Sequence, residues 1–233
     1  MNHKRLFLSV IVLGVFVTSL DLNAQDGRLN DFELWAKLAA EGDIGQRIKL
    51  GLEEQIRFDE NSSEVKNYFT ELALNYRLSD NFALLGRARF LTRNDNSGGD
   101  QGKKNYFRYQ LGFRLKHQTG QFRFNHRFLY QRRDRFNLTP EEGDIIVKYA
   151  RYRFKTEYKI KKWKYDPIFT AEYFLALDND IEELPNAFRL GIGTERKYEG
   201  FGTLGLFYRY EWTTNFIYPE GNFILALAYT YTF

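Results

Sequence analysis

Apolar and polar residues alternate with a period of two in many segments of this chain, and this pattern limits what the chain can fold into. From Phe107 to Lys116 the odd positions are Phe, Tyr, Leu, Phe and Leu, while the even positions are Arg, Gln, Gly, Arg and Lys. Successive side chains of a β-strand point to opposite faces, so the alternation predicts strands with one apolar and one polar face. The pattern is clear over residues 122–131, 151–160, 204–212 and 223–233, and weaker over 46–58, 66–77, 81–92, 165–177 and 186–197.

The composition favours a β-barrel that carries its aromatic residues on the outside. Aromatic residues make up 18% of the chain, yet its mean hydropathy is −0.52. The interior of a barrel of about eight to ten strands has no room for several large apolar residues from every strand. We therefore expect the apolar face to contact lipid, and we predict a single antiparallel transmembrane β-barrel rather than a soluble barrel with an apolar interior.

Both ends of the chain carry signals of export. A His-Lys-Arg segment at residues 3–5 precedes an uncharged apolar run at 6–17, and small residues end at Ala24. A run of about a dozen residues is shorter than the roughly 20 that a spanning helix needs, so we predict a signal peptide that is cleaved after Ala24. The alternating C-terminal strand ends at Phe233, where we expect the barrel-assembly machinery to bind. The predicted location is the outer membrane.

The spacing of the strands predicts about ten of them, with twelve as the alternative. Short turns fall at 79–80, 119–120, 161–164 and 199–200, and longer polar connections fall near 59–65, 93–104, 133–145, 178–186 and 213–222. This arrangement is typical of short periplasmic turns and longer extracellular loops. The chain then divides into a signal peptide at 1–24, an N-terminal segment at 25–45 and the barrel at 46–233. Because odd strand counts are uncommon in bacterial barrels, residues 25–45 are predicted to form a short inner or periplasmic strand.

The polar face, when placed inside, gives the lumen a large excess of basic side chains. Its bases are Arg47, Lys49, Arg57, Arg77, Arg87, Arg89, Arg108, Arg114, Lys116, Arg123, Arg127, Arg151, Arg153, Lys155, Lys159, Arg189, Lys197 and Arg209. Its acids are Glu53, Glu71, Glu157, Glu172, Glu195 and Glu211. An unpaired buried charge is unfavourable, so one hypothesis is a narrow, hydrated, anion-preferring channel. The alternative is a structural barrel whose lumen these side chains fill by pairing with one another and extending to the rims.

Two groups of arginines are candidate binding residues. The candidate anion contacts in the lumen are Arg87, Arg89, Arg108, Arg114, Arg123, Arg127, Arg151 and Arg153. Arg132, Arg133 and Arg135 enter a predicted outer loop, where bidentate contacts to the phosphates of lipopolysaccharide are possible and an ordinary solvated rim is the alternative. The expected partners are thus outer-membrane lipid and lipopolysaccharide, and the expected state is a monomer. Glu54 stands out, because a carboxylate on the apolar face is unfavourable away from the membrane interface.

Catalysis and cofactor chemistry have little support in the sequence. The chain has no cysteine, and beyond the signal peptide its only histidines are His117 and His126, neither of which has an obvious serine and acid beside it. The acidic segment at 178–183 has oxygen ligands of the kind that calcium prefers, as any solvated acidic loop does. We expect no catalytic residue, cofactor, metal or nucleic-acid partner. The alternative functions are a lipid- or envelope-modifying enzyme and a surface adhesin or receptor that uses the loops.

Three N-terminal segments resemble a known family. These are Asp31-Phe32-Glu33-Leu34-Trp35, Leu52-Glu53-Glu54-Gln55-Ile56-Arg57-Phe58, and Tyr68-Phe69-Thr70-Glu71-Leu72 with Tyr76-Arg77-Leu78. They are similar to domain of unknown function 2490, a family found in outer membranes of Bacteroidetes-type bacteria, and the similarity covers most of the chain after the signal peptide. The resemblance implies an outer-membrane barrel without an assigned activity, and it assigns no functional residues.

Overall fold

The computed structural model describes residues 29–95, 102–139, 144–177, 185–214 and 220–233, so the predicted signal peptide lies outside the described residues. This part of the chain forms eleven strands: β1 (Leu29–Ile44), β2 (Ile48–Asp59), β3 (Glu64–Arg77), β4 (Phe82–Asp95), β5 (Gly102–Thr119), β6 (Phe122–Arg135), β7 (Val147–Tyr158), β8 (Pro167–Ala176), β9 (Asn186–Tyr198), β10 (Gly202–Thr214) and β11 (Glu220–Thr232). Among these residues there is no helix long and apolar enough to cross a membrane, which says nothing about crossing by strands.

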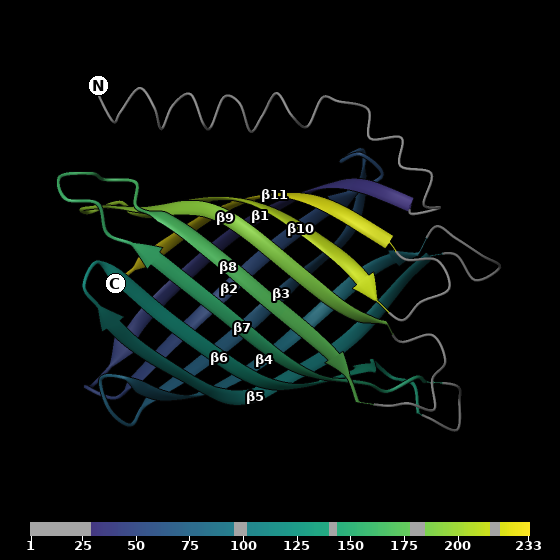
Figure 1. Ribbon diagram of the computed structural model, residues 1–233. Coiled ribbons are helices and arrows are strands. Elements are labelled where there is room, and N and C mark those ends of the chain that lie inside the picture. Colours follow the sequence, from purple (N-terminus) through teal and green to yellow (C-terminus); the bar gives the residue numbers. More distant parts are fainter. Residues whose placement is uncertain (1–28, 96–101, 140–143, 178–184, 215–219) are drawn as a thin grey trace.

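The strands close into one barrel, wound obliquely around its axis (Figure 1). Each strand pairs with its neighbours along the chain in antiparallel fashion, and β1 closes the ring by pairing with β11. This last pairing is parallel, with Leu29 opposite Glu220 and Glu41 opposite Thr232. When strands alternate in direction, an odd number brings the first and the last together pointing the same way.

The prediction of ten strands is wrong, and so is the alternative of twelve. The segment predicted as a short inner or periplasmic strand at 25–45 contains β1, which is a full member of the barrel wall. The even count of most bacterial barrels argues against an eleventh strand. That argument does not apply here, because β1 and β11 pair in parallel. This pairing satisfies the backbone hydrogen bonds of both edge strands without an even number of strands.

The connections between the strands lie alternately at the two ends of the barrel. We call the end that holds Thr232 the C-terminal end; the β1–β2, β3–β4, β5–β6, β7–β8 and β9–β10 connections also lie there. In the β7–β8 connection the ammonium group of Lys159 donates a hydrogen bond to the Asp166 carboxylate at 2.7 Å, and this bond raises the pKa of Lys159. The Ile160 N–H donates to the same carboxylate at 2.9 Å. Leu29 and Glu220 lie at the opposite end.

The alternation read from the sequence corresponds to an outer and an inner face. Leu111 and Phe128 are exposed on the outer face, whereas Gln110 and Arg127 on the same two strands are buried in the lumen. Outer aromatic rings contact one another across strands, as Phe113 and Phe128 do with ring centroids 4.9 Å apart. Polar and charged residues therefore fill the barrel, and the large apolar residues mostly face outward.

The lumen also contains an apolar cluster, which lies beneath the β1/β11 seam. Its members are Trp35, Ile168, Phe207, Ile224 and Ala226. The wall makes room for them by placing glycine opposite a ring: a Cβ atom at Gly193 would lie 2.3 Å from the Leu206 carbonyl oxygen and 2.3 Å from Cδ1 of Phe207. The interior of this barrel is thus partly a hydrophobic core, an arrangement that the alternation alone does not predict.

The last residue of the chain fastens the seam on the outside. The Phe233 N–H donates a hydrogen bond to the Glu41 carbonyl oxygen at 3.0 Å. Its ring covers Gly42, where a Cβ atom would lie 2.3 Å from the ring atom Cε2. Any larger residue at position 42 would displace this ring, so the pair helps to hold β1 against β11.

Candidate anion site in the barrel lumen

Glu71 of β3 is the centre of a first group of charges. It is 1% exposed, and the strand register places it opposite Arg89 of β4, which is in turn opposite Arg108 of β5. Arg87 Nη1 and Arg89 Nε donate to the two carboxylate oxygens at 2.6 and 2.7 Å, and Arg108 Nη2 lies 4.0 Å away. The Glu71 carboxylate therefore compensates mainly the charges of Arg87 and Arg89, which bond to it.

Glu172 of β8 is the centre of a second group. The register places it between Arg153 of β7 and Arg189 of β9. Arg127 and Arg151 donate to its Oε1 at 3.1 and 2.8 Å, and Arg189 donates to its Oε2 at 3.3 Å. Arg127 comes from β6, so this carboxylate joins side chains from four strands. Hydrogen bonds between charged groups such as these are stronger than those between neutral groups.

Two glutamines extend the second group toward Arg87 of the first, which the register places opposite Gln110. Gln110 donates to the side-chain oxygen of Gln131 at 2.8 Å, and Arg151 donates to the same oxygen at 2.7 Å. We call the two groups and the glutamines together the paired layer; it consists of Glu71, Arg87, Arg89, Arg108, Gln110, Arg127, Gln131, Arg151, Glu172 and Arg189. Most of its members are buried, and the layer occupies the middle of the barrel.

Aromatic rings support the guanidinium groups next to the paired layer. The guanidinium carbon of Arg89 lies 3.4 Å from the centroid of the Phe69 ring, and that of Arg57 lies 3.7 Å from the Trp35 ring. A cation placed over an aromatic face is stabilised, more so when water is excluded. Trp35 therefore joins the apolar cluster to the charged layer.

A second region of the lumen, nearer the C-terminal end, is a cavity of about 450 Å³. We call it the basic vestibule and define it by the bases that line it: Arg47, Lys49, Arg77, Arg114 and Lys116. Lys49 pairs with Glu41 at 3.2 Å and Arg77 lies 4.0 Å from Asp43. Within the described ranges, no carboxylate forms an ion pair with Arg47, Arg114 or Lys116.

A further cavity of about 360 Å³, the middle cavity, is lined by every member of the paired layer except Glu71, and it shares Glu41 and Arg87 with the vestibule. Arg153 lines it and forms no ion pair with a described carboxylate. The buried Nε atoms of Arg108, Arg127 and Arg153 have no hydrogen-bond partner in the described part of the chain. Because buried donors are normally satisfied, these groups favour a ligand with several acceptor oxygens.

The predicted lumen arginines fall into three environments. Arg87, Arg89, Arg108, Arg127 and Arg151 belong to the paired layer. Arg153 lines the same middle cavity without an ion pair to a described carboxylate, and Arg114 lines the vestibule. Arg123 is separate from them: it lies 3.9 Å from Glu157 and lines a different cavity of about 380 Å³ at the C-terminal end. The sequence thus identifies residues of the lumen face, but it does not show which of them form ion pairs with a carboxylate.

The three candidate lipopolysaccharide contacts do not lie on one surface. Strand β6 continues to Arg135, so neighbouring residues alternate in direction. Arg132 donates to Asp134 at 2.9 Å, while the guanidinium of Arg133 lies 5.0 Å from the Tyr106 ring centroid and Arg133 is half-buried. The Arg135 N–H donates to the Asp144 carboxylate at 3.0 Å.

Strand β1 contributes site residues that the sequence reasoning missed. Glu33 is 2% exposed, accepts a hydrogen bond from the Trp35 indole N–H at 2.6 Å and pairs with Lys66 at 2.7 Å. Glu41 lines the vestibule. The signal for them is present in the sequence, because Glu33, Trp35 and Glu41 alternate with apolar residues as lumen residues do elsewhere.

The two histidines and Glu54 have ring or hydrogen-bond partners in the structure. His117 and His126 stack with ring centroids 5.3 Å apart, and His126 Nδ1 is 2.9 Å from the Tyr152 hydroxyl. The described residues contain no group of three or more His, Asp or Glu side chains that could hold a metal ion. The acidic segment at 178–183 lies outside the described residues. Glu54 lies on the outer face, where it accepts a hydrogen bond from the Thr70 hydroxyl at 2.7 Å.

These features define a class: a closed eleven-stranded β-barrel with a charged interior and an apolar outer face. The chain belongs to the family described as Protein of unknown function (DUF2490), whose sequence profile matches residues 32–218. This confirms the family resemblance seen in the N-terminal segments. Comparison with curated proteins and with solved structures gave no match.

Proposed function

We propose that the protein is an outer-membrane β-barrel whose lumen takes up small anions at the C-terminal end, with the paired layer limiting their passage. The membrane location is supported by the exposed apolar residues on the outer face and by the export signals of the sequence. The anion preference is carried by one observation: within the described residues, Arg47, Arg114 and Lys116 line a cavity and form no ion pair, although Glu41 and Asp80 line it too.

The chemistry of the vestibule suits anions. Its bases converge on a space large enough for an oxyanion and some water, and charge-assisted hydrogen bonds to oxyanions are stronger than neutral ones. If the C-terminus is periplasmic, as short-turn barrel ends generally are, the vestibule opens to the periplasm. No catalytic step is part of this proposal.

The test is single-channel recording of refolded protein in planar bilayers under a salt gradient. We expect small, discrete, anion-preferring openings. The triple variant Arg47→Ser, Arg114→Ser, Lys116→Ser should insert equally well and lose the anion preference. Cation-preferring openings of the unmodified protein would contradict the proposal.

A second candidate function is a structural barrel that conducts nothing. It is favoured by the burial of the paired layer, in which Glu71 and Gln110 are almost inaccessible to solvent. Silent but correctly inserted protein in the same recordings would support this function and exclude passage of anions.

A further inference from the structure

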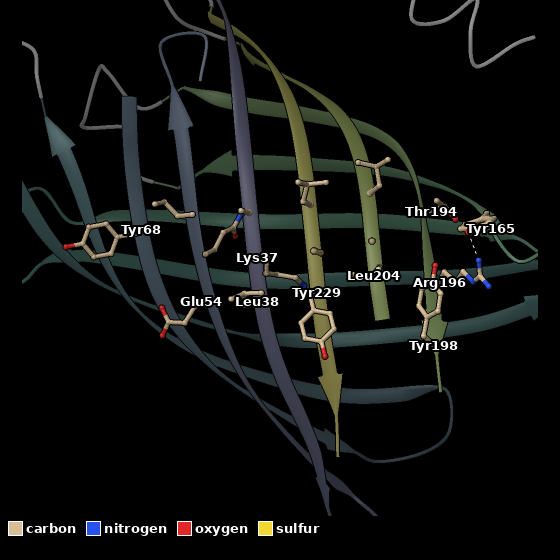
Figure 2. Close-up of a pocket in the computed structure, with 17 residues that line it drawn as sticks. Lys37, Leu38, Glu54, Tyr68, Tyr165, Thr194, Arg196, Tyr198, Leu204 and Tyr229 are labelled. Carbon is tan, nitrogen blue, oxygen red and sulfur yellow. Dashed lines mark hydrogen bonds between the residues drawn. The ribbon is translucent and has the colours of Figure 1, made fainter. Parts of the chain in front are cut away.

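An apolar groove of about 810 Å³ crosses the outer face of the barrel over the β1/β11 seam. Figure 2 shows Glu54 and Tyr68 on one side of it and Tyr165, Arg196 and Tyr198 on the other, with Leu38, Tyr229 and Leu204 between them. The two sides differ chemically, because one holds a carboxyl group and the other a guanidinium group among tyrosines.

The register aligns the groove as one row of side chains across five strands. In order, the row is Arg196, Leu204, Tyr229, Leu38 and Glu54. Neighbouring strands are about 4.8 Å apart and tilted by about 35–45° in transmembrane barrels, so the row climbs roughly 12 Å along the barrel axis. Half of a hydrocarbon core is about 15 Å thick. The row therefore matches the depth of one leaflet.

Arg196 lies at the shallow end of this row, two residues before β9 ends at Tyr198. Its guanidinium carbon lies 4.9 Å from the Tyr165 ring centroid and 4.4 Å from that of Tyr198, and it donates a hydrogen bond to the Tyr165 hydroxyl. No described carboxylate pairs with it. Arginine and tyrosine at this depth match the phosphate level of a bilayer.

The floor of the groove is apolar. Leu204 is 42% exposed, and Leu206 and Leu227 beside it are similarly open, while Ala36 leaves space at the seam. At the deep end the Glu54 carboxyl accepts a hydrogen bond from the Thr70 hydroxyl, which offsets part of the unfavourable free energy of a carboxyl group away from the membrane interface. The groove thus offers an anion contact at one end and a long apolar surface leading away from it.

We propose that this groove binds one phospholipid from the leaflet at the C-terminal end of the barrel. Arg196 and the Tyr165 hydroxyl bind the lipid phosphate, and an acyl chain lies along Leu204, Leu227 and Leu38 toward Glu54. The inference rests on the proposed outer-membrane location, but not on the anion preference of the lumen.

The test is native mass spectrometry of the detergent-solubilised protein titrated with phosphatidylglycerol. Arg196→Gln removes the phosphate contact, and Leu204→Trp fills the floor. The matched controls are Lys159→Gln, which changes a base paired with Asp166 at the same end of the barrel, and Leu84→Trp. Leu84 is 44% exposed, and like Leu204 it is the third residue of a strand that starts at the C-terminal end.

We expect the unmodified protein and both controls to bind one lipid with similar affinity, and the two groove variants to bind about tenfold more weakly. Equal binding by all five proteins would overturn the proposal. A dimer that excludes lipid and is broken by Leu204→Trp would also overturn it, because a second copy would then occupy the groove. Insertion into vesicles is measured separately: unmodified protein that does not insert contradicts the outer-membrane location, whereas inserted protein without selective binding contradicts only the groove.

Discussion

In the middle of the lumen, Glu71 and Glu172 each bond to several arginines, whereas toward the C-terminal end Arg47, Arg114 and Lys116 have no such carboxylate among the described residues. Exposure differs in the same way, because Glu71 and Glu172 are buried and Arg47 and Lys116 are exposed. Arg153 is an exception, since it is half-buried and forms no ion pair with a described carboxylate. An ion taken out of water needs a partner, while a base that faces a wet cavity does not. The same residue type therefore serves stability in the paired layer and remains available to a ligand in the vestibule.

The strongest test of the difference between the paired layer and the vestibule is to remove a central carboxylate of the paired layer. Glu71→Gln leaves Arg87, Arg89 and Arg108 without their shared partner, and we expect a loss of about 3–5 kcal/mol in the free energy of unfolding, because unpaired charges stay buried. Urea unfolding of the protein in lipid vesicles measures it. The control is Glu41→Gln in the vestibule, which breaks only a pair with Lys49 and should cost less than about 1 kcal/mol. Equal losses would show that the two regions do not differ.

A second variant tests the aromatic support of the layer. Trp35→Leu removes the ring beneath Arg57 and part of the apolar cluster, and we expect a loss of about 2–3 kcal/mol. Trp212→Leu is the control, since that ring stacks on Phe188 of the outer face at 5.4 Å and its removal should cost about 1 kcal/mol. The same unfolding assay applies; a smaller effect at Trp35 would mean that the ring does not support the layer.

The vestibule should respond in the opposite direction. The triple variant Arg47→Ser, Arg114→Ser, Lys116→Ser removes mutual repulsion, so we expect unchanged stability or a gain of up to about 1 kcal/mol. A loss comparable with that of Glu71→Gln would assign these bases a structural role and remove the distinction between the two regions.

Salt should have the smallest effect on the free energy of unfolding, and it should affect the two variants differently. Any gain from the triple variant should vanish near 1 M salt, where the screening length is about 3 Å. The loss caused by Glu71→Gln should persist, because buried charges are screened much less. Unfolding curves at low and high salt measure both, and a parallel response of the two variants would contradict their different burial.

Much of the fold can be predicted from the sequence, because the period of two fixes which face each strand residue occupies. It places Arg87, Arg108 and Arg127 in the lumen without any knowledge of strand pairing. The closure of the barrel could not be predicted in this way. Alternation identifies β1 as a strand, but nothing local specifies that it pairs in parallel with a strand at the far end of the chain.

The sequence predicts which residues line the lumen, but it does not predict which of them form ion pairs with one another. Arg127 and Glu172 are 45 positions apart and meet only through the strand register and the curvature of the wall. Whether a lumen base is compensated depends on such long-range contacts, so Arg89 and Arg114 look equivalent in the sequence and differ in the structure. A prediction that continued β6 through Arg132 and Arg133 would have placed their side chains on opposite faces of the strand.

The most direct test of the account is calorimetric titration of pyrophosphate into the refolded protein. Three proteins are compared: the unmodified chain, the vestibule triple variant, and Arg123→Ser, Lys155→Ser, Lys159→Ser, which removes equal charge from bases that pair with carboxylates. We expect the vestibule variant to bind at least about tenfold more weakly and the matched variant to bind almost normally. Equal weakening of both variants, or undiminished binding by the vestibule variant, would contradict the assignment of the anion site to the uncompensated bases.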